Sequence, residues 1–164
     1  MLDIFTIAFF GHRYIENPNN VESLLEQQII KYIQNKEYVE FLVGRNGEFD
    51  SCVSSVIHRV RKKYRKDNSS LSLMLPYLTA EYSKNKSYFE DYYDNIEISY
   101  TALNAHPKAA IQQRNREMTD RADLIICYVK NNSGGAYQTV KYASKIKKTL
   151  SIKGRFSIRG RFYD

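Results

Sequence analysis

The sequence has few of the residues that mark secreted, fibrous or membrane-spanning proteins. Among its 164 residues are two cysteines, Cys52 and Cys127, without C-x-x-C spacing, so neither a disulfide framework nor a metal site is expected. Seven glycines and three prolines exclude a collagen-like or low-complexity chain. No apolar run approaches the roughly 20 residues of a membrane span, and residues 2–10 lack the flanks of a signal peptide. We therefore expect one globular domain over residues 1–164, cytoplasmic and without a membrane partner.

The positive charge of the chain is concentrated at its C-terminal end. The net charge is +7 and the isoelectric point about 9.3, yet residues 1–140 carry 17 basic and 17 acidic side chains. The excess lies in the last 24 residues, where we expect a basic strand or tail over residues 150–164. Such a segment can contact phosphates, although a solvated basic face is the commoner cause. Nucleic acid is thus an open partner but not the favoured one.

Four short apolar runs predict strands that are buried on both faces. They are residues 2–10, 38–43, 71–75 and 124–129. Helical periodicity separates the first three runs, and two further helices are expected from Pro107 to Arg121 and from Ser133 or Gly134 to about Lys148. This alternation predicts an α/β fold, a Rossmann-like three-layer sandwich with a mostly parallel sheet of about five strands.

Two segments fit this pattern less well. Residues 77–106 have no clean period and contain six of the 14 tyrosines, which favours an irregular flap or insertion with a short helix. From Leu150 onward the apolar residues are spaced roughly in twos, which predicts one or two extra strands at an edge of the sheet.

The loops that follow the predicted strands carry glycines and polar residues. Gly11, His12 and Arg13 follow the first strand, residues 44–47 follow the second, and residues 133–135 follow the fourth. In an open α/β sheet such loops share one edge, where glycines and helix N-termini favour an anionic ligand. Neither a G-x-x-x-x-G-K-[ST] phosphate loop nor a G-x-G-x-x-G fingerprint is present, which argues against ordinary ATP or NAD chemistry. No cofactor is expected.

A resemblance to a known family appears in the second half of the chain. Residues 114–118 (RNREM), residues 122–123 (AD), an apolar strand and residues 133–139 (SGGAYQT) resemble the SLOG superfamily of Rossmann-like domains. This superfamily joins the Lonely Guy (LOG) nucleoside-monophosphate phosphoribohydrolases to the Smf/DprA proteins. With residues 11–13 and 44–50, the chain looks most like the small bacterial YpsA-like branch, thought to bind nucleotide-type ligands. The resemblance covers residues 4–143 and implies a SLOG-like Rossmannoid domain of bacterial or phage origin. Homodimers are common in that family, so a homodimer is one expected partner state.

The motif of the LOG enzymes is only half present. Those enzymes carry R-K-x-x-M ahead of P-G-G-x-G-T-x-x-E, where the arginine and the final glutamate act on the bond between ribose and base. The matching residues are Arg114, Met118, Gly134 and Gly135. Asn115 and Ser133 replace the lysine and the proline, and Lys141 or Tyr142 stands where the glutamate belongs. Because N-glycoside cleavage requires a carboxylate, we expect binding rather than LOG-type catalysis.

The residues expected to bind the ligand come from three loops and from the helices next to them. They are Gly11, His12, Arg13, Gly44, Asn46, Gly47, Asp50, Arg114, Asn115, Ser133, Gly134, Gly135, Ala136, Tyr137 and Thr139. Gly134, Gly135 and the adjacent helix N-terminus would hold phosphate, which Arg114 and Arg13 would neutralise. Alternatively, Arg114 pairs with a carboxylate such as Asp120 or Asp123.

The other candidates also have two readings. Asn115 can hydrogen-bond a ribose or base, or lie on the helix surface. Asp50 and Glu48 can accept ribose hydroxyls or act as a base, or cap the following helix. His12 can donate to phosphate, or merely bond its own loop. Tyr137 can stack on a base, with Tyr77 or Tyr82 closing the pocket, or pack in the core.

Three functions are therefore open. The favoured one is binding of a nucleotide or nucleotide-derived signalling ligand, as a sensor or sequestering protein. The alternative is a nucleotide N-glycosidase, for which Asp50, Glu48 and Arg114 are weak catalytic candidates. The second alternative is a DprA-like module that binds single-stranded DNA through the basic C-terminal end.

Overall fold

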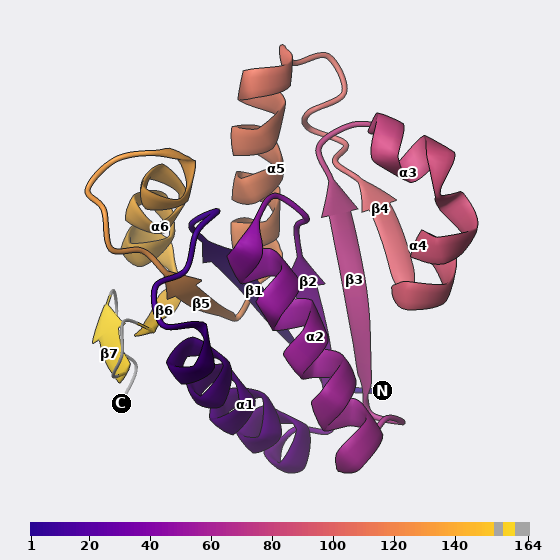
Figure 1. The fold of residues 1–164 in the computed structure, drawn as a ribbon, viewed down its shortest axis with the longest axis vertical. Helices are drawn as coiled ribbons and strands as arrows, with labels where there is room; N and C mark the ends of the chain where they lie inside the picture. The colour runs from indigo at the N-terminus through magenta and orange to yellow at the C-terminus, as the bar shows by residue number, and fades with distance from the viewer. Residues whose placement is uncertain (153–155, 160–164) are drawn as a thin grey trace.

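The computed structural model describes residues 1–152 and 156–159, which form one seven-stranded sheet flanked by helices (Figure 1). The strands lie in the order β4-β3-β2-β1-β5-β6-β7. Their bounds are β1 Ile4–Gly11, β2 Tyr38–Val43, β3 Ser69–Leu75, β4 Asn95–Ile98, β5 Leu124–Tyr128, β6 Lys148–Ile152 and β7 Phe156–Arg159. The first six strands are parallel, and β7 pairs antiparallel with β6 at the edge.

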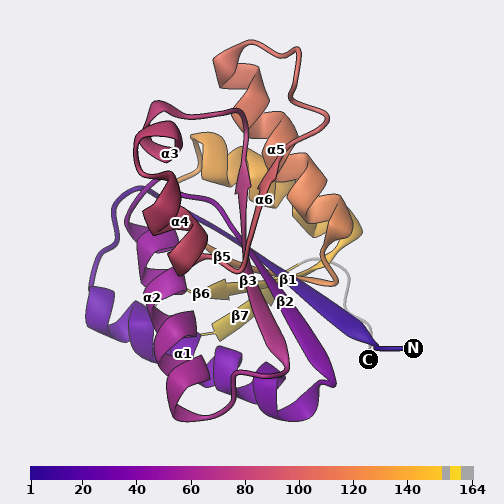
Figure 2. The same cartoon turned by 90° about the vertical axis from the view of Figure 1, so that its right-hand side faces the viewer.

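Helices cover both faces of the sheet, as Figure 2 shows most clearly. On one face lie α1 (Pro18–Asn35), α2 (Glu48–Lys63), α3 (Ala80–Lys84) and α4 (Lys86–Tyr92), and on the other lie α5 (Pro107–Arg121) and α6 (Gly135–Ile146). None of the helices in the described part of the chain is long and apolar enough to cross a membrane. The arrangement confirms the predicted Rossmann-like α/β sandwich with a mostly parallel sheet.

The core forms because the strands carry apolar side chains on both faces. Ile7, Phe9 and Phe41 belong to the large cluster under α1 and α2, whereas Ala8 and Phe10 belong to the smaller cluster that includes α5 and α6 residues. Alternate residues of β1 thus serve the two layers, as the period of two in a strand requires.

The structure corrects the sequence analysis in three details. The sheet has a further strand, β4, within residues 77–106, where only an irregular flap or insertion with a short helix was expected. The same stretch holds two short helices rather than one. The last helix ends at Ile146, and Lys148 already belongs to β6. One or two edge strands were expected after Leu150: β6 pairs with β5, and β7 forms the edge. Residues 153–155 and 160–164 of the predicted basic tail lie outside the described residues.

The strand order reverses beside β1. From β1 the chain proceeds through β2, β3 and β4 to one edge, and it then returns to place β5 on the other side of β1. Adjacent loops diverge at such a point and leave a crevice at the carboxyl ends of the strands. The loops after β1, β2 and β5 therefore border one crevice.

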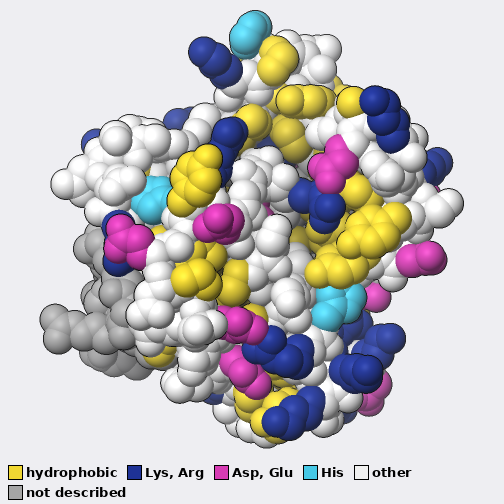
Figure 3. All heavy atoms as spheres, viewed as in Figure 1, with side chains coloured by type: hydrophobic (Ala, Val, Ile, Leu, Met, Phe, Trp, Pro, Cys, Tyr) yellow, Lys and Arg dark blue, Asp and Glu magenta, His cyan; other side chains and the backbone are white. Residues whose placement is uncertain are grey.

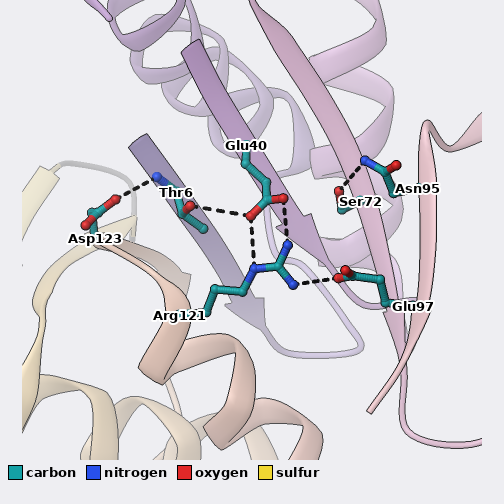
Figure 4. A network of polar contacts seen from close by, with 7 residues as sticks. All are labelled: Thr6, Glu40, Ser72, Asn95, Glu97, Arg121 and Asp123. Carbon is teal, nitrogen blue, oxygen red and sulfur yellow. Dashed lines mark hydrogen bonds and ion pairs between the residues drawn. The ribbon is translucent and has the colours of Figure 1, made fainter. Parts of the chain in front are cut away.

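A polar clip fixes the lower end of α5 on the sheet (Figure 4). Arg121, at the last position of α5, bonds Glu40 of β2 at 2.7 Å and Glu97 of β4 at 2.6 Å. Beside it, Asp123 accepts a hydrogen bond from the backbone N–H of Thr6 at 2.8 Å. Since Arg114 lies seven residues earlier, on the same face of the helix, this clip also sets the position of Arg114 over the strand ends.

Candidate functional site

A cavity of about 730 Å³ lies at the carboxyl edge of the sheet. Its walls come from β1 and its following loop, from the loop after β2, from α5 and from the loop that leads into α6. The structure brings most of the predicted site residues together there: Gly11, His12, Arg13, Gly44, Asn46, Asp50, Arg114, Asn115, Ser133, Gly134, Gly135 and Ala136. The turn at Ser133 and the guanidinium of Arg114 thus face one shared space.

Three predicted residues do not line this cavity. Gly47 borders a neighbouring cavity instead. Tyr137 is half-buried against the smaller hydrophobic cluster, and Thr139 is buried beneath the first turn of α6. Tyr77 and Tyr82 do not reach the cavity either. The ring of Tyr82 packs against Phe89, which explains its partial burial.

Arg114 is the most unusual member of the site. Its side chain is only 2% exposed, and its Nε and Nη1 groups donate to the side-chain oxygen of Asn115 and the carbonyl of Met74, each at 2.8 Å. Both acceptors are neutral. Among the described residues no carboxylate forms an ion pair with it: Asp120 bonds Tyr142, Asp123 bonds Thr6, and Asp50 acts on it only through its charge. The alternative that Arg114 pairs with one of these two aspartates is therefore wrong.

Burial has the expected effect on this cation. Desolvation lowers the pKa of Arg114, and the charge of Asp50 opposes this shift. An ideal Cβ on Gly44 would lie 3.1 Å from Asp50 Oδ2 and 3.2 Å from Arg114 Nη1, so the absent side chain of Gly44 leaves room for both groups. Arg114 is thus a buried guanidinium on a cavity wall without a directly bonded anion, which is costly unless an anion enters the cavity.

Asp50 lies across Gly44 from Arg114. Its Oδ2 accepts the backbone N–H of Asn46 at 2.8 Å, and burial raises the pKa of Asp50 against the opposing influence of that bond and of Arg114. The other acidic candidate, Glu48, faces away from this cavity and accepts the backbone N–H of Ile15 at 2.7 Å. Both carboxylates lie in the first turn of α2, and the bond from Asn46, just before the N-cap Gly47, agrees with the alternative that Asp50 helps to cap this helix.

Asn115 has both ends of its amide bonded to protein. The oxygen accepts from Arg114, and the nitrogen donates to Thr139 Oγ1 at 2.9 Å, while that hydroxyl donates to the carbonyl of Gly135 at 3.0 Å. These bonds join the guanidinium of Arg114 to the first turn of α6. The amide is better placed to position Arg114 than to contact a sugar or base, the role expected from sequence.

The N-terminus of α6 faces the cavity through a glycine pair. Gly134 is the N-cap and has φ of 94°, a conformation that residues with a Cβ rarely adopt. Ser133, Gly134 and Gly135 are exposed, and a Cβ at Gly134 would meet no atom within 4 Å. The first N–H groups of this 12-residue helix are therefore accessible to a ligand, with the positive end of the helix dipole behind them.

The loop after β1 is fastened on both sides. His12 Nε2 accepts backbone N–H groups of Lys130 at 2.9 Å and Asn131 at 3.2 Å, so this nitrogen carries no proton. On the other side, the carbonyl of Arg13 accepts from the N–H of Glu48 at 2.8 Å. These bonds favour the loop-fastening role for His12, whereas the side chain of Arg13 is exposed.

Sequence reasoning missed several residues of the cavity wall. Lys108 begins the wall from the first turn of α5, and Lys130 forms an ion pair with Glu16 at 2.8 Å across the opening. Tyr14 is 81% exposed beside Arg13. Lys130 and Tyr14 lie just after predicted strands, so their closeness to a strand end could have placed them at the cavity. Lys108 had no such signal.

The charge around the cavity is locally positive. Arg13, Lys108, Arg114 and Lys130 line it together with the carboxylates Glu16 and Asp50. Elsewhere on the face seen in Figure 3, basic and acidic side chains are interspersed rather than gathered into one broad basic surface. The local excess therefore suits a compact anion.

The position of the LOG glutamate contributes nothing to this cavity. Lys141 is exposed, Tyr142 donates to Asp120 at 2.7 Å, and neither residue lines the cavity wall. The carboxylate nearest to Arg114 that faces the cavity is instead Asp50, from a different helix.

Comparison with known proteins identifies the fold. No protein-family profile and no curated protein sequence matches the chain. Its structure is similar to that of DNA processing protein A (DprA) from Streptococcus pneumoniae, with a TM-score of 0.64 and 14% sequence identity. The match covers 93% of this chain and 51% of that one, so the chain spans about half the length of the DprA structure. The likeness establishes a DprA-like fold, while the expected YpsA-like branch stays a prediction.

Proposed function

We propose that this protein binds a nucleotide or nucleotide-derived molecule through its phosphate, as a sensor or a sequestering protein. The observation that carries the proposal is the buried guanidinium of Arg114 on the cavity wall, which is bonded to two neutral acceptors and to no carboxylate of the described residues. A phosphate supplies the missing negative charge and accepts bidentate hydrogen bonds from arginine. The exposed N-terminus of α6, which packs beside α5, supplies further donors from the adjoining wall.

The size and composition of the cavity support this ligand class. Its volume of about 730 Å³ falls within the range of about 300–1,000 Å³ that is typical of small-molecule sites. Arg13, Lys108 and Lys130 add positive charge near the opening, and the exposed ring of Tyr14 can stack on a base. An inorganic anion would leave most of this space empty.

The proposal is tested by native mass spectrometry and calorimetry. We expect the purified protein to retain, or to bind on titration, one of the four ribonucleoside monophosphates, and Arg114→Met to weaken that binding at least about 100-fold, as loss of a charged hydrogen-bond donor from a buried site implies. Arg116→Met is the matched control because Arg116 is exposed on the same helix and stacks over Tyr142. Equal affinity in wild type and Arg114→Met would contradict the proposal.

Single-stranded DNA is a second candidate ligand. The fold is that of a protein named for DNA processing, and an exposed tyrosine beside several cations is the composition of a site for single strands. DNA binding predicts an affinity that rises with strand length and falls steeply with salt. If it depends on the basic tail, deletion of residues 153–164 removes it, whereas binding at the cavity is lost in Arg114→Met.

A further inference from the structure

We propose that the ligand has two units joined through phosphate, and that the second unit occupies a neighbouring cavity. This inference rests on the proposed function of the first cavity and adds the class of ligand. The second cavity has a volume of about 860 Å³ and is lined by residues of α1 and α2, by the loops before these two helices and by Glu81 of α3. It shares Arg13, Tyr14, Ile15 and Asn46 with the first cavity.

The shared wall can be crossed by a ligand. Arg13, Tyr14 and Asn46 are exposed at the boundary, so the wall is open to solvent. The backbone beneath them is held against α2 by two hydrogen bonds, from Glu48 N–H to Arg13 and from Ile15 N–H to Glu48. A phosphate linkage that passes over this fixed wall meets the guanidinium of Arg13 with the ring of Tyr14 beside it.

The two cavities differ in charge. Four cationic side chains and two carboxylates line the first, whereas Glu22, Glu48 and Glu81 line the second with Arg13 and Arg45. Glu81 already pairs with Arg45 at 2.9 Å, and Glu22 pairs with Arg59. The second cavity is therefore unfavourable for a further phosphate, and it suits a neutral unit that donates hydrogen bonds to carboxylate oxygens.

A nucleoside or a ribose has this chemistry. Ribose hydroxyls donate to acidic side chains in nucleotide sites, and Ser51 and Ser55 add two hydroxyl groups on the exposed side of α2. Cys52 also lines the cavity, but burial and Glu22 raise its pKa to about 11, so it is a neutral thiol at pH 7. The second cavity therefore suits non-covalent binding of the second unit, and a covalent bond to Cys52 is not expected.

The test compares ligands with one and two units. The probes are the four ribonucleoside monophosphates, the corresponding 5′-phosphorylated dinucleotides, ADP-ribose and a 12-residue deoxyoligonucleotide. Calorimetry on the wild type should give at least a 10-fold higher affinity for one of the two-unit probes than for its mononucleotide. The affinity should not rise further with the oligonucleotide.

A substitution that fills the second cavity tests whether the higher affinity for two-unit probes comes from that cavity. Ser55→Trp fills the second cavity without touching the first, and Ser23→Trp places the same ring on exposed α1 surface away from both cavities. We expect Ser55→Trp to abolish the 10-fold gain and to change the mononucleotide affinity less than twofold, with no effect of Ser23→Trp. A gain that survives Ser55→Trp, or no gain in the wild type while mononucleotides still bind, would overturn the two-unit ligand alone.

Two further outcomes of the binding measurements would also overturn the proposal. Affinity that keeps rising from dinucleotide to oligonucleotide would overturn the two-unit proposal in favour of a polymeric strand. Failure of every probe to bind would overturn both the two-unit ligand and the proposed nucleotide function.

Discussion

Nη1 of Arg114 lies 2.8 Å from the carbonyl oxygen of Met74, at the carboxyl end of β3. This contact fixes a buried guanidinium on the cavity wall by a neutral acceptor, and among the described residues no carboxylate neutralises it by an ion pair. A structural arginine in a core normally has a bonded counter-charge. Arg114 instead has the environment of an anion-binding group, because a bound anion would supply the counter-charge that the described residues do not bond to it.

The stability of Arg114→Met follows from this environment. The substitution removes a desolvated charge, which costs several kcal/mol to bury, and also removes two hydrogen bonds of about 1.5–3 kcal/mol each. These effects oppose one another, so we expect the free energy of unfolding without ligand to stay within about 1 kcal/mol of wild type. Urea denaturation measures it. A loss above about 3 kcal/mol would indicate a purely structural arginine.

Asp50→Asn should change the pH dependence of stability. Burial raises the pKa of Asp50 above its ordinary value of 3.8, so the folded state holds this proton more tightly than the unfolded state does. The free energy of unfolding therefore falls as the pH rises from 3.8 through the raised pKa, and the asparagine variant lacks this part of the fall. Denaturation at a series of pH values measures the difference. An unchanged profile would contradict the raised pKa.

The same variant separates binding from catalysis. If the protein only binds its ligand, removal of a carboxylate beside the phosphate site leaves the affinity unchanged or raises it. If Asp50 replaces the missing LOG glutamate, the wild type releases free base from a nucleoside monophosphate, and Asp50→Asn abolishes that release. Chromatography of the reaction mixture decides, and we expect no turnover.

Thr139 is expected to matter through Arg114 rather than by contact with ligand. Thr139→Val leaves the buried amide of Asn115 without an acceptor, which costs about 1–3 kcal/mol and loosens the guanidinium that this amide holds. Thr139→Ser keeps the hydroxyl and should retain wild-type stability within about 1 kcal/mol. We expect weaker nucleotide binding in the valine variant and near-normal binding in the serine variant. Equal binding in both would remove Thr139 from the account.

Gly47 and Gly135 should respond differently to alanine. A Cβ at Gly47 would lie 2.5 Å from the Cα of Arg13, so the loop between the two cavities must move, whereas at Gly135 it would meet only the flexible end of Gln112 at 3.1 Å. We expect Gly47→Ala to cost about 1–3 kcal/mol and to weaken binding, since overpacking against backbone cannot relax locally. Gly135→Ala should be milder on both counts. The reverse order would contradict the described loop packing.

The sequence predicted the parallel strands well because their side chains are buried on both faces. Residues 38–43 and 124–129 are almost wholly apolar, and the strands they form, β2 and β5, both pair directly with β1. β4 was missed because it has only four residues, too few for their alternation to stand out within a tyrosine-rich stretch that has no clean period.

The sequence predicted the location of the candidate site better than the roles of its individual residues. Strand-end loops converge for topological reasons, so His12, Gly44 and Ser133 could be placed on one edge. The roles of individual side chains depend on partners distant in sequence. Asn115 bonds Thr139, and Arg114 bonds Met74 40 residues away, contacts that no local pattern encodes.

The most direct measurement is the affinity of wild type and Arg114→Met for a nucleoside monophosphate and for the same nucleoside without phosphate. If the guanidinium awaits a phosphate, the wild type binds the nucleotide at least about 100-fold more tightly than the nucleoside, and this preference disappears in Arg114→Met while nucleoside binding changes little. A wild type that does not distinguish the two compounds, or a preference that persists without the guanidinium, would contradict the account.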